Sequence, residues 1–470
     1  MRYYTQGRFR QQADFMRRQF AQEGSLPFGD VLSMPMIQHA LDLIERVWLD
    51  RIYSPVVTLW VFLSQVLSED HSCRAAVARL MAHRISRGEQ PCSAETGGYC
   101  QARKRLPEKM ISGLVRETGR ALETQAQPKW LWKGRHVKVF DGSTVSMPDT
   151  PENQAAYPQP STQKEGVGFP LARIAAVFSL ACGAVLDLGI CRYAGKGQSE
   201  LGLLRLLWDA FKPGDVMLAD RYLCSWFEMA ILKQRRVDSA CRLHQQRPVD
   251  FRRGKRLGKE DHLVQWPKPP KPDWLDQKTY DSLPDVLTIR KIRVRTTQPG
   301  FRSEQVVVAT TLLDAAQISK HELAEVYRAR WNAELDLRSL KQTLQMDVLR
   351  CKTPELVRKE IWTHLLAYNL IRTVIAQAAH RHDLPPRSIS FKGTIQTLEA
   401  FAPLIANCQS ADKRLILYQH LLAAIANHKV ANRPGRYEPR CRKRRPKPYP
   451  LLTKPRHEAK LQILKQVKQN

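Results

Sequence analysis

One segment in the C-terminal half of the chain carries residue types that bind metal ions and phosphate. Residues 327–341 read YRARWNAELDLRSLK. At about 100° per residue on a helix, a stripe about 60° wide holds a phenol, two cations and a carboxylate: Tyr327, Arg330, Glu334 and Lys341. An apolar stripe beside it would dock the helix on a core. The simpler alternative is that Arg330 and Glu334 form an i,i+4 surface pair, worth only about 0.2–0.5 kcal/mol.

Two aspartates follow predicted β strands. Residues 136–145 and 214–220 read as strands, and the pattern places Asp141 and Asp220 at their ends. With Glu334 they make three carboxylates from three separated segments. Hard cations need such oxygen ligands, and two cations held about 3.5–4 Å apart promote phosphodiester cleavage and transfer. We therefore predict that these three residues are catalytic and bind two Mg²⁺ ions, or Mn²⁺.

The spacing Tyr, two residues, Arg, three residues, Glu, six residues, Lys resembles the signature of the insertion-sequence-four family of DDE transposases. Its first aspartate follows a strand as in VFDGST and its second ends a strand as in LADRYL, which match Asp141 and Asp220. The N-terminal stretches SCRAAVARL and GGYCQARKRLP and the tail RPGRYEPRCRKRRPKPYPLLTKPR also look like bacterial members of this family. The resemblance thus covers nearly the whole chain.

The resemblance implies a DNA transposase that binds the ends of an insertion sequence and catalyses metal-dependent cleavage and strand transfer by cut and paste. It implies double-stranded DNA as the partner, both terminal repeats and target, and a homodimer that bridges two ends. Arg330 and Lys341 would neutralise phosphate oxygens, and Tyr327 would donate a hydrogen bond to a phosphate or support a displaced base. These three are the predicted DNA-binding residues. Relatives stack a flipped base on a tryptophan, for which Trp266 and Trp274 are the candidates.

Two other functions stay open. One is a catalytically inactive, transposase-derived DNA-binding regulator, which the presence of all three carboxylates disfavours. The other is an RNase H-like nuclease or resolvase that cuts without joining. The spacing of Lys341 and the predicted β insertion favour strand transfer over plain nicking.

The elements around these residues predict an α/β fold with a mixed sheet. The order strand, strand, strand, helix, strand, helix, with acidic residues after the first strand and after the strand that follows the helix, is that of an RNase H-like core. A Pro-rich, basic stretch with alternating apolar residues then predicts a β-rich insertion. We expect a helical N-terminal DNA-binding region over 1–130, the RNase H-like core over 131–239, the β insertion over 240–311, the rest of the core with the catalytic helix over 312–380, and C-terminal helices with a basic tail over 381–470.

The charge of the chain points to a polyanionic partner. Lys and Arg number 75 against 45 Asp and Glu, which gives a net charge of +30 and a pI near 10.0. The ten cysteines form no CxxC pair, so a disulfide framework and a zinc site are disfavoured. No apolar run is long enough to cross a bilayer, and the first residues lack a secretory apolar core. We expect a cytoplasmic, nucleoid-associated bacterial protein without a membrane partner.

The N-terminal region offers one candidate DNA reader. Residues 72–87 predict a helix, and residues 99–105 follow after a polar turn. Together they fit a helix-turn-helix that presents four side chains to a groove: Gln101, Arg103, Lys104 and Arg105. The alternative is a helical bundle with a solvated basic face.

Overall fold

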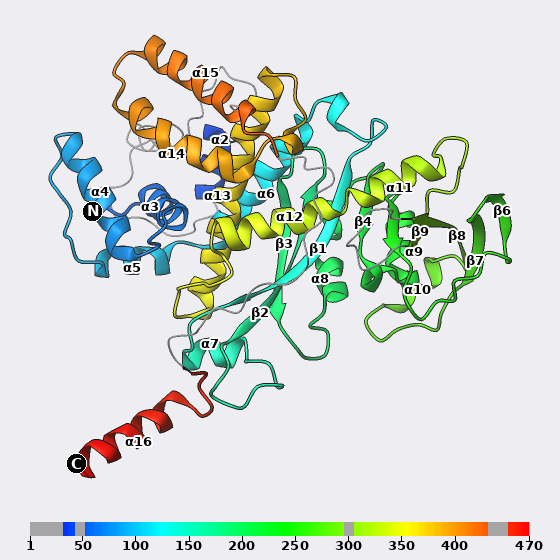
Figure 1. Ribbon diagram of the computed structural model, residues 1–470, viewed down its shortest axis with the longest axis horizontal. Coiled ribbons are helices and arrows are strands. Elements are labelled where there is room, and N and C mark those ends of the chain that lie inside the picture. Colours follow the sequence, from blue (N-terminus) through cyan, green and yellow to red (C-terminus); the bar gives the residue numbers. More distant parts are fainter. Residues whose placement is uncertain (1–31, 43–51, 296–304, 431–449, 470) are drawn as a thin grey trace.

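The structure is a computed structural model, which describes residues 32–42, 52–295, 305–430 and 450–469. Most of the predicted basic tail lies outside the described residues. An elongated body holds helices at one end and a long sheet that runs to the other end, while the last helix projects away from it (Figure 1).

A single mixed sheet forms the centre of the molecule. Its strands are β1 Val137–Ser146, β2 Leu171–Ser179, β3 Val185–Arg192, β4 Val216–Ala219, β5 Asp238–Arg242, β6 Lys255–Gly258, β7 Asp261–Pro267, β8 Val286–Arg295 and β9 Gln305–Thr310. They lie in the order β3-β2-β1-β4-β5-β9-β8-β7-β6. β1, β2 and β3 are antiparallel neighbours, and β4 and β5 run parallel to β1. This order and these directions confirm the predicted RNase H-like core.

The strands of the predicted insertion continue this sheet. β9 pairs antiparallel with β5, and β8, β7 and β6 follow outward in turn. The backbone hydrogen bonds of β5 are therefore satisfied on both edges, by β4 and by β9. The basic, Pro-rich stretch is thus tied to the core through main-chain pairing.

Helices flank the sheet on both sides. In the N-terminal part lie α2 Met34–Asp42, α3 Pro55–Leu67, α4 Cys73–Ser86, α5 Gly97–Arg105 and α6 Glu108–Thr124. Between the strands lie α7 Pro151–Ala156, α8 Glu200–Leu206, α9 Trp226–Gln234 and α10 Gln277–Ser282. After β9 come α11 Lys320–Arg328, α12 Trp331–Arg338, α13 Pro354–Arg381, α14 Phe391–Asn407, α15 Ala411–Asn427 and α16 Arg456–Gln469.

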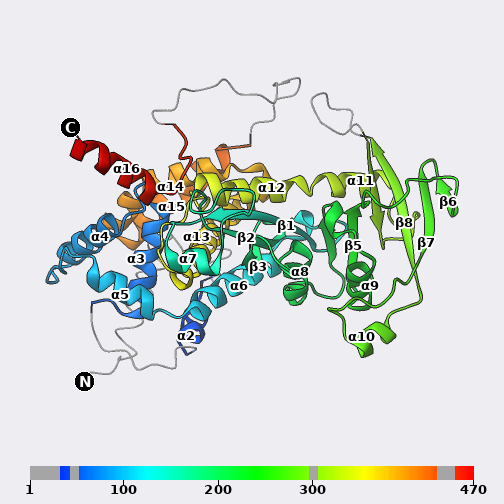
Figure 2. The ribbon, with the colours of Figure 1, turned by 90° about the horizontal axis from the view of Figure 1, so that it is seen from below.

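The sheet has an apolar core on each face. Val139 of β1 belongs to a cluster that includes residues of α12 and α13, whereas the next residue, Phe140, belongs to a cluster with α8 and α9. Figure 2 shows α11 and α12 on one side of the sheet and α8 and α9 on the other. Because successive side chains of a strand point to opposite faces, Asp141 shares the α12 side with Val139.

The helix that carries the predicted motif is interrupted. A capping box at Ser319 and Glu322 starts α11 where the sequence predicts it. Residues Ala329 and Arg330 separate α11 from α12, and a π-helical turn, Ser339–Thr343, follows α12. The helix that carries Glu334 is therefore an eight-residue segment, and not the single continuous helix that the periodicity predicts.

The prediction that Asp141 lies at the end of a strand is also wrong. β1 continues past it to Ser146, because β2 pairs with this half of the strand as far as Leu171. Asp141 lies in mid-strand, whereas Asp220 follows the last residue of β4 as predicted.

We expect Gly119→Ala to destabilise the fold although alanine favours helices. A Cβ at Gly119 in α6 would lie 2.2 Å from the carbonyl oxygen of Val185 in β3, so helix and strand must move apart. The expected loss is about 1–3 kcal/mol in urea unfolding. The control is Gly97→Ala in α5, where a Cβ meets nothing within 4 Å. Equal stability of the two variants would contradict the close packing of α6 on β3.

Candidate active site

Asp141 and Asp220 lie on neighbouring strands at the centre of the sheet. Val139 of β1 lies opposite Leu218 of β4 in parallel register. Continued for two more residues, this register sets Asp141 level with Asp220, the residue that follows the end of β4, and both carboxylates raise the pKa of Arg330. The sheet thus brings together two carboxylates that are 79 positions apart in the chain.

Asp141 is a largely buried carboxylate. Burial raises its pKa from 3.8 to about 6; the nearby Arg330 guanidinium and a hydrogen bond from the Gly142 amide lower the pKa, whereas Glu334 and Glu200 raise it. The hydrogen bond from the Gly142 amide to the Asp141 carboxylate measures 2.9 Å. The charged form of Asp141 is therefore costly unless a cation compensates it.

Arg330 connects the strand carboxylate to the helix carboxylate. One guanidinium nitrogen donates to Glu334 at 2.9 Å, and another lies 3.6 Å from the Asp141 carboxylate. Its side chain is only 15% exposed, against 38% for Glu334. Burial alone lowers the pKa of this guanidinium, but Tyr327 and the carboxylates of Asp141 and Asp220 raise it by more. The i,i+4 pair of the simpler alternative does form, but it is not confined to the surface, because Arg330 is mostly buried and also lies near Asp141.

Tyr327 is a buried anchor. Its hydroxyl donates to the carbonyl oxygen of Ala219 at 3.3 Å, and burial raises its pKa. Ala219 is the last residue of β4, so this bond holds α11 against the strand that delivers Asp220. In this structure the protein itself uses the hydroxyl proton, and the hydrogen bond from Tyr327 to a DNA phosphate, or its support of a displaced base, stays a prediction.

Lys341 reaches back to the sheet. Its ammonium group donates to the hydroxyl of Ser143 at 3.0 Å, two residues beyond Asp141 on the same face of β1. The side chain is half-buried, and this burial lowers its pKa, while Asp347 raises it. The Lys341 ammonium group thus lies two residues along β1 from Asp141.

Glu200, on the α8 face of the sheet, is a carboxylate near Asp141 that sequence reasoning missed. It is the first residue of α8, where it accepts a hydrogen bond from Arg173 at 3.3 Å. A Cβ on Gly142 would lie 2.7 Å from its carboxylate oxygen, so a glycine next to Asp141 makes room for it. Ser199 marks the helix start as an N-cap, but no spacing in the sequence links Glu200 to Asp141.

The donor chemistry of this site fits a hard divalent cation. Asp141 is a largely buried carboxylate near the Arg330 guanidinium, and Asp220 and Glu334 offer carboxylate oxygens from two further elements. Within the described residues, no three His, Cys, Asp or Glu side chains are grouped closely enough to hold a metal ion. Mg²⁺ usually takes one or two carboxylates and keeps waters and substrate phosphates as its other ligands. An open set of carboxylates suits that mode.

The structure corrects the predicted groove-reading residues. Arg103 in α5 is buried, donates to Cys73 at 3.1 Å and lies over the ring of Tyr99. It therefore cannot reach a DNA groove. Three of the predicted residues are exposed: Gln101, Lys104 and Arg105.

An arginine lies over the ring of each candidate tryptophan. Trp266 is buried, with the Arg247 guanidinium 3.7 Å from its ring centre. Trp274 is 38% exposed, but Arg205 lies 3.5 Å from its ring centre. For a base to stack on that side of the ring, Arg247 would have to move away from Trp266, or Arg205 from Trp274.

The strand order of this sheet is that of an RNase H-like core. Aspartates on its central strands beside a glutamate on a helix are typical of the DDE nucleic-acid transferases. The transposase DDE domain family matches residues 132–370, a range that contains all three carboxylates. The chain belongs to the DDE transposases of the insertion-sequence-four family.

Individual relatives agree with this family. The chain is 27% identical over 438 residues to the transposase InsG for insertion sequence element IS4 of Escherichia coli strain K12, covering 91% of this chain and 93% of the relative. It is 40% identical over 82 residues, 17% of this chain, to the putative transposase InsL for insertion sequence element IS186A of the same strain. A piggyBac transposase in a synaptic complex with hairpin DNA covers 91% of this chain at 9% identity and a TM-score of 0.42, too weak a likeness to compare residues.

Across the described part of the chain, none of the helices combines the length and apolar character that a membrane span needs.

We expect Asp141→Asn to stabilise the metal-free protein at neutral pH. Its pKa of about 6 against 3.8 means that the folded state prefers the neutral acid, so the ionised group costs up to about 3 kcal/mol above pH 6. Wild-type stability should rise as the pH falls from about 6 to about 4, and the advantage of Asp141→Asn should vanish there. Urea unfolding with chelator at pH 8 and pH 4 measures both.

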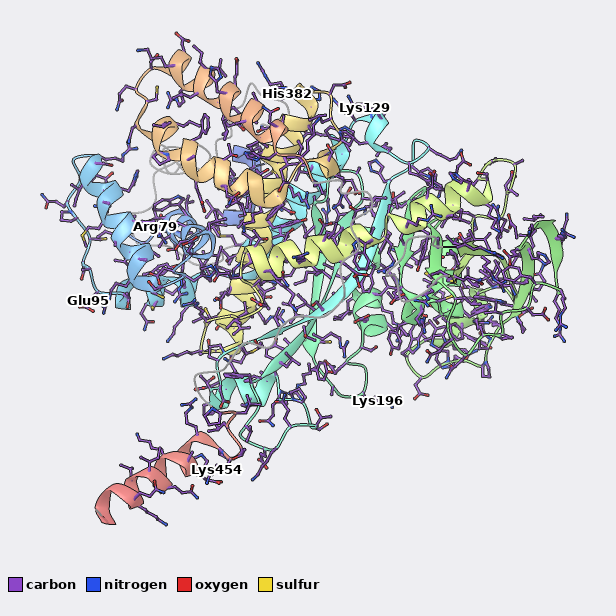
Figure 3. The ribbon with its side chains drawn as sticks, viewed as in Figure 1. Arg79, Glu95, Lys129, Lys196, His382 and Lys454 are labelled. Carbon is purple, nitrogen blue, oxygen red and sulfur yellow. The ribbon has the colours of Figure 1, made fainter. Side chains whose placement is uncertain are left out.

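The matched control is Asp273→Asn. Asp273 is 93% exposed and lies beside Lys196. Lys196 is labelled at the surface in Figure 3. This variant should match the wild type at both pH values. An Asp141→Asn variant that is less stable than the wild type at pH 8 would show that Arg330 more than offsets the burial of the carboxylate.

Proposed function

We propose that this transposase binds the ends of an insertion sequence and catalyses metal-dependent phosphodiester cleavage followed by strand transfer, by cut and paste. One observation carries the proposal. Arg330 lies between Asp141 and Glu334 and so holds the carboxylates of β1 and α12 close together, beside the position that the strand register gives Asp220.

Asp141, Asp220 and Glu334 are the proposed ligands of two Mg²⁺ ions, for which Mn²⁺ can substitute. When bound, such ions supply Lewis-acid stabilisation of the phosphate and lower the pKa of bound water. The three side chains orient the scissile phosphate, since each comes from a rigid element of the core. Arg330 and Lys341 neutralise phosphate oxygens next to them, and the buried setting strengthens these interactions.

The proposed partner is double-stranded DNA. The β6–β7 edge of the sheet exposes a run of cations: Arg252, Arg253, Lys255, Arg256 and Lys259. Such cations contact phosphates without reading sequence and make affinity fall with salt. A homodimer that bridges two transposon ends, at the nucleoid in the cytoplasm, completes the proposal.

We expect each carboxylate to be required for cleavage but not for binding. Asp141→Asn, Asp220→Asn and Glu334→Gln should shift DNA that carries the element's terminal repeats at wild-type affinity, yet cut none of it, because a ligand is lost while phosphate contacts stay. A mobility-shift assay and a denaturing gel with Mg²⁺ measure the two properties. Glu325→Gln, on the exposed side of α11, is the control and should cut normally. Wild-type cleavage by one of the three variants would remove that residue from the ligand set.

We expect Arg330→Ala and Lys341→Ala to reduce end cleavage by roughly tenfold to a hundredfold, because misplaced phosphates react slowly. Arg338→Ala, which removes an exposed cation from the same helix, is the matched control and should retain activity within about twofold. Melting temperatures measured alongside separate lost positioning from lost folding. Full activity of both variants would contradict the proposed phosphate contacts of Arg330 and Lys341.

A further inference from the structure

The catalytic helix carries a second, buried carboxylate. Asp336 is fully buried, whereas Glu334, two residues before it, is partly exposed. Two residues correspond to about 200° of rotation, so the two carboxylates leave α12 on nearly opposite sides. Around the helix, the buried residues Ala333 and Leu337 lie between the two carboxylates. The inward side of the helix is thus part apolar and part charged.

Two arginines from different elements bind Asp336. Arg372 of α13 donates to one carboxylate oxygen at 2.5 Å. Arg387, in the short 3-10 helix Pro386–Ser388, donates to both oxygens at 2.7 Å. Both arginine side chains are largely buried. Charge-assisted bonds of this kind are short and directional, so they fix where the carboxylate lies.

The same arginines hold the turn that joins β2 to β3. Arg387 donates to the carbonyl oxygens of Ser179 at 2.8 Å and Leu180 at 2.9 Å. Arg372 donates to the hydroxyl of Tyr368, which donates to the carbonyl oxygen of Gly183 at 3.0 Å.

Gly183 shows how closely this turn packs. It has a φ of +82°, and a Cβ there would lie 2.8 Å from the Arg372 guanidinium. The turn, the two arginines and the catalytic helix are therefore packed as one unit.

The helical hydrogen bonding is irregular at both ends of the catalytic helix. Ala329 and Arg330, which keep right-handed helical backbone angles, separate it from α11, and the π-helical turn Ser339–Thr343 follows it. Rotation of an eight-residue helix by a few tens of degrees would move Glu334 away from Asp141. Apolar contacts alone tolerate such a rotation, since they are not directional.

We infer that Asp336 is a positioning residue, which fixes the rotation of the catalytic helix through Arg372 and Arg387 so that Glu334 faces Asp141. The inference rests on the proposed function, in which Glu334 is a metal ligand. Asp336 lies behind the helix and contacts neither DNA nor metal. Its effect reaches the site through the orientation of Glu334, as partners behind a metal ligand do.

The test compares Asp336→Asn with a matched buried pair elsewhere. Asp261 in β7 binds the fully buried Arg290 through bonds of 2.8 and 2.6 Å, far from the carboxylates, so Asp261→Asn imposes a similar loss of a buried charge. Mn²⁺ binding to the full chain is followed by the electron paramagnetic resonance of the free ion, and end cleavage is measured against Mn²⁺ concentration. We expect Asp336→Asn to raise the Mn²⁺ midpoint roughly tenfold or more in both assays. Asp261→Asn should lower the melting temperature without moving either midpoint.

Two outcomes would overturn the inference. In the first, Asp336→Asn lowers only the melting temperature; in the second, Asp261→Asn moves the Mn²⁺ midpoint by as much. Glu334→Gln, measured alongside, keeps the two proposals apart. If it weakens Mn²⁺ binding and Asp336→Asn does not, only the role of Asp336 is wrong. If Glu334→Gln binds Mn²⁺ like the wild type, the ligand assignment of the proposed function falls, and the role of Asp336 falls with it.

Substitutions of Arg387 cover the case in which Asp336→Asn fails to fold. Arg387 lies nearer the surface than Arg372, so its loss is better tolerated. Arg387→Met should raise the Mn²⁺ midpoint, and Arg387→Lys, which keeps the charge but not the fork, should raise it less. Equal and unchanged midpoints in both variants would show that the network only stabilises the fold.

Discussion

The attraction of one arginine for two carboxylates holds the centre of this molecule together. Arg330 contacts Asp141 on the sheet and Glu334 on the helix, and both carry negative charge in a partly buried setting. Without a cation between them, burial and mutual repulsion would favour separation of strand and helix. The guanidinium allows the acidic groups to stay close before any metal or DNA phosphate arrives. This arrangement brings like charges close together, so the surrounding structure must hold it in place.

The surrounding structure does so by enclosing the sheet. β1 alternates its side chains between two apolar cores, one with α12 and α13 and one with α8 and α9. This alternation sends Asp141 toward α12, and Gly142 toward Glu200 on α8. Because a register slip of one residue would exchange the two faces, pairing with β2 and β4 also determines which carboxylates meet.

Two buried ion pairs fix the orientation of secondary-structure elements in this chain. Asp336 with its two arginines orients the catalytic helix, and Asp261 with Arg290 ties β7 to β8 in the outer sheet. Such pairs often stabilise a fold no better than apolar residues of the same volume would, but their bonds specify geometry. The surface cations serve another purpose: the net charge of +30 attracts DNA over long distances and does not determine where it docks.

The sequence by itself determined the fold class, and it predicted the three carboxylates and the stripe of Tyr327, Arg330, Glu334 and Lys341. It could do so because strand and helix periodicities are local, and because the motif has a fixed spacing along one helical segment. Only the tertiary structure decided that Tyr327 faces inward to Ala219, that Arg103 is buried, and that Glu200 and Asp336 belong to the catalytic region. Each of these depends on a partner 27 or more positions away in the chain, and no local pattern encodes which distant group a polar side chain will meet when the core closes.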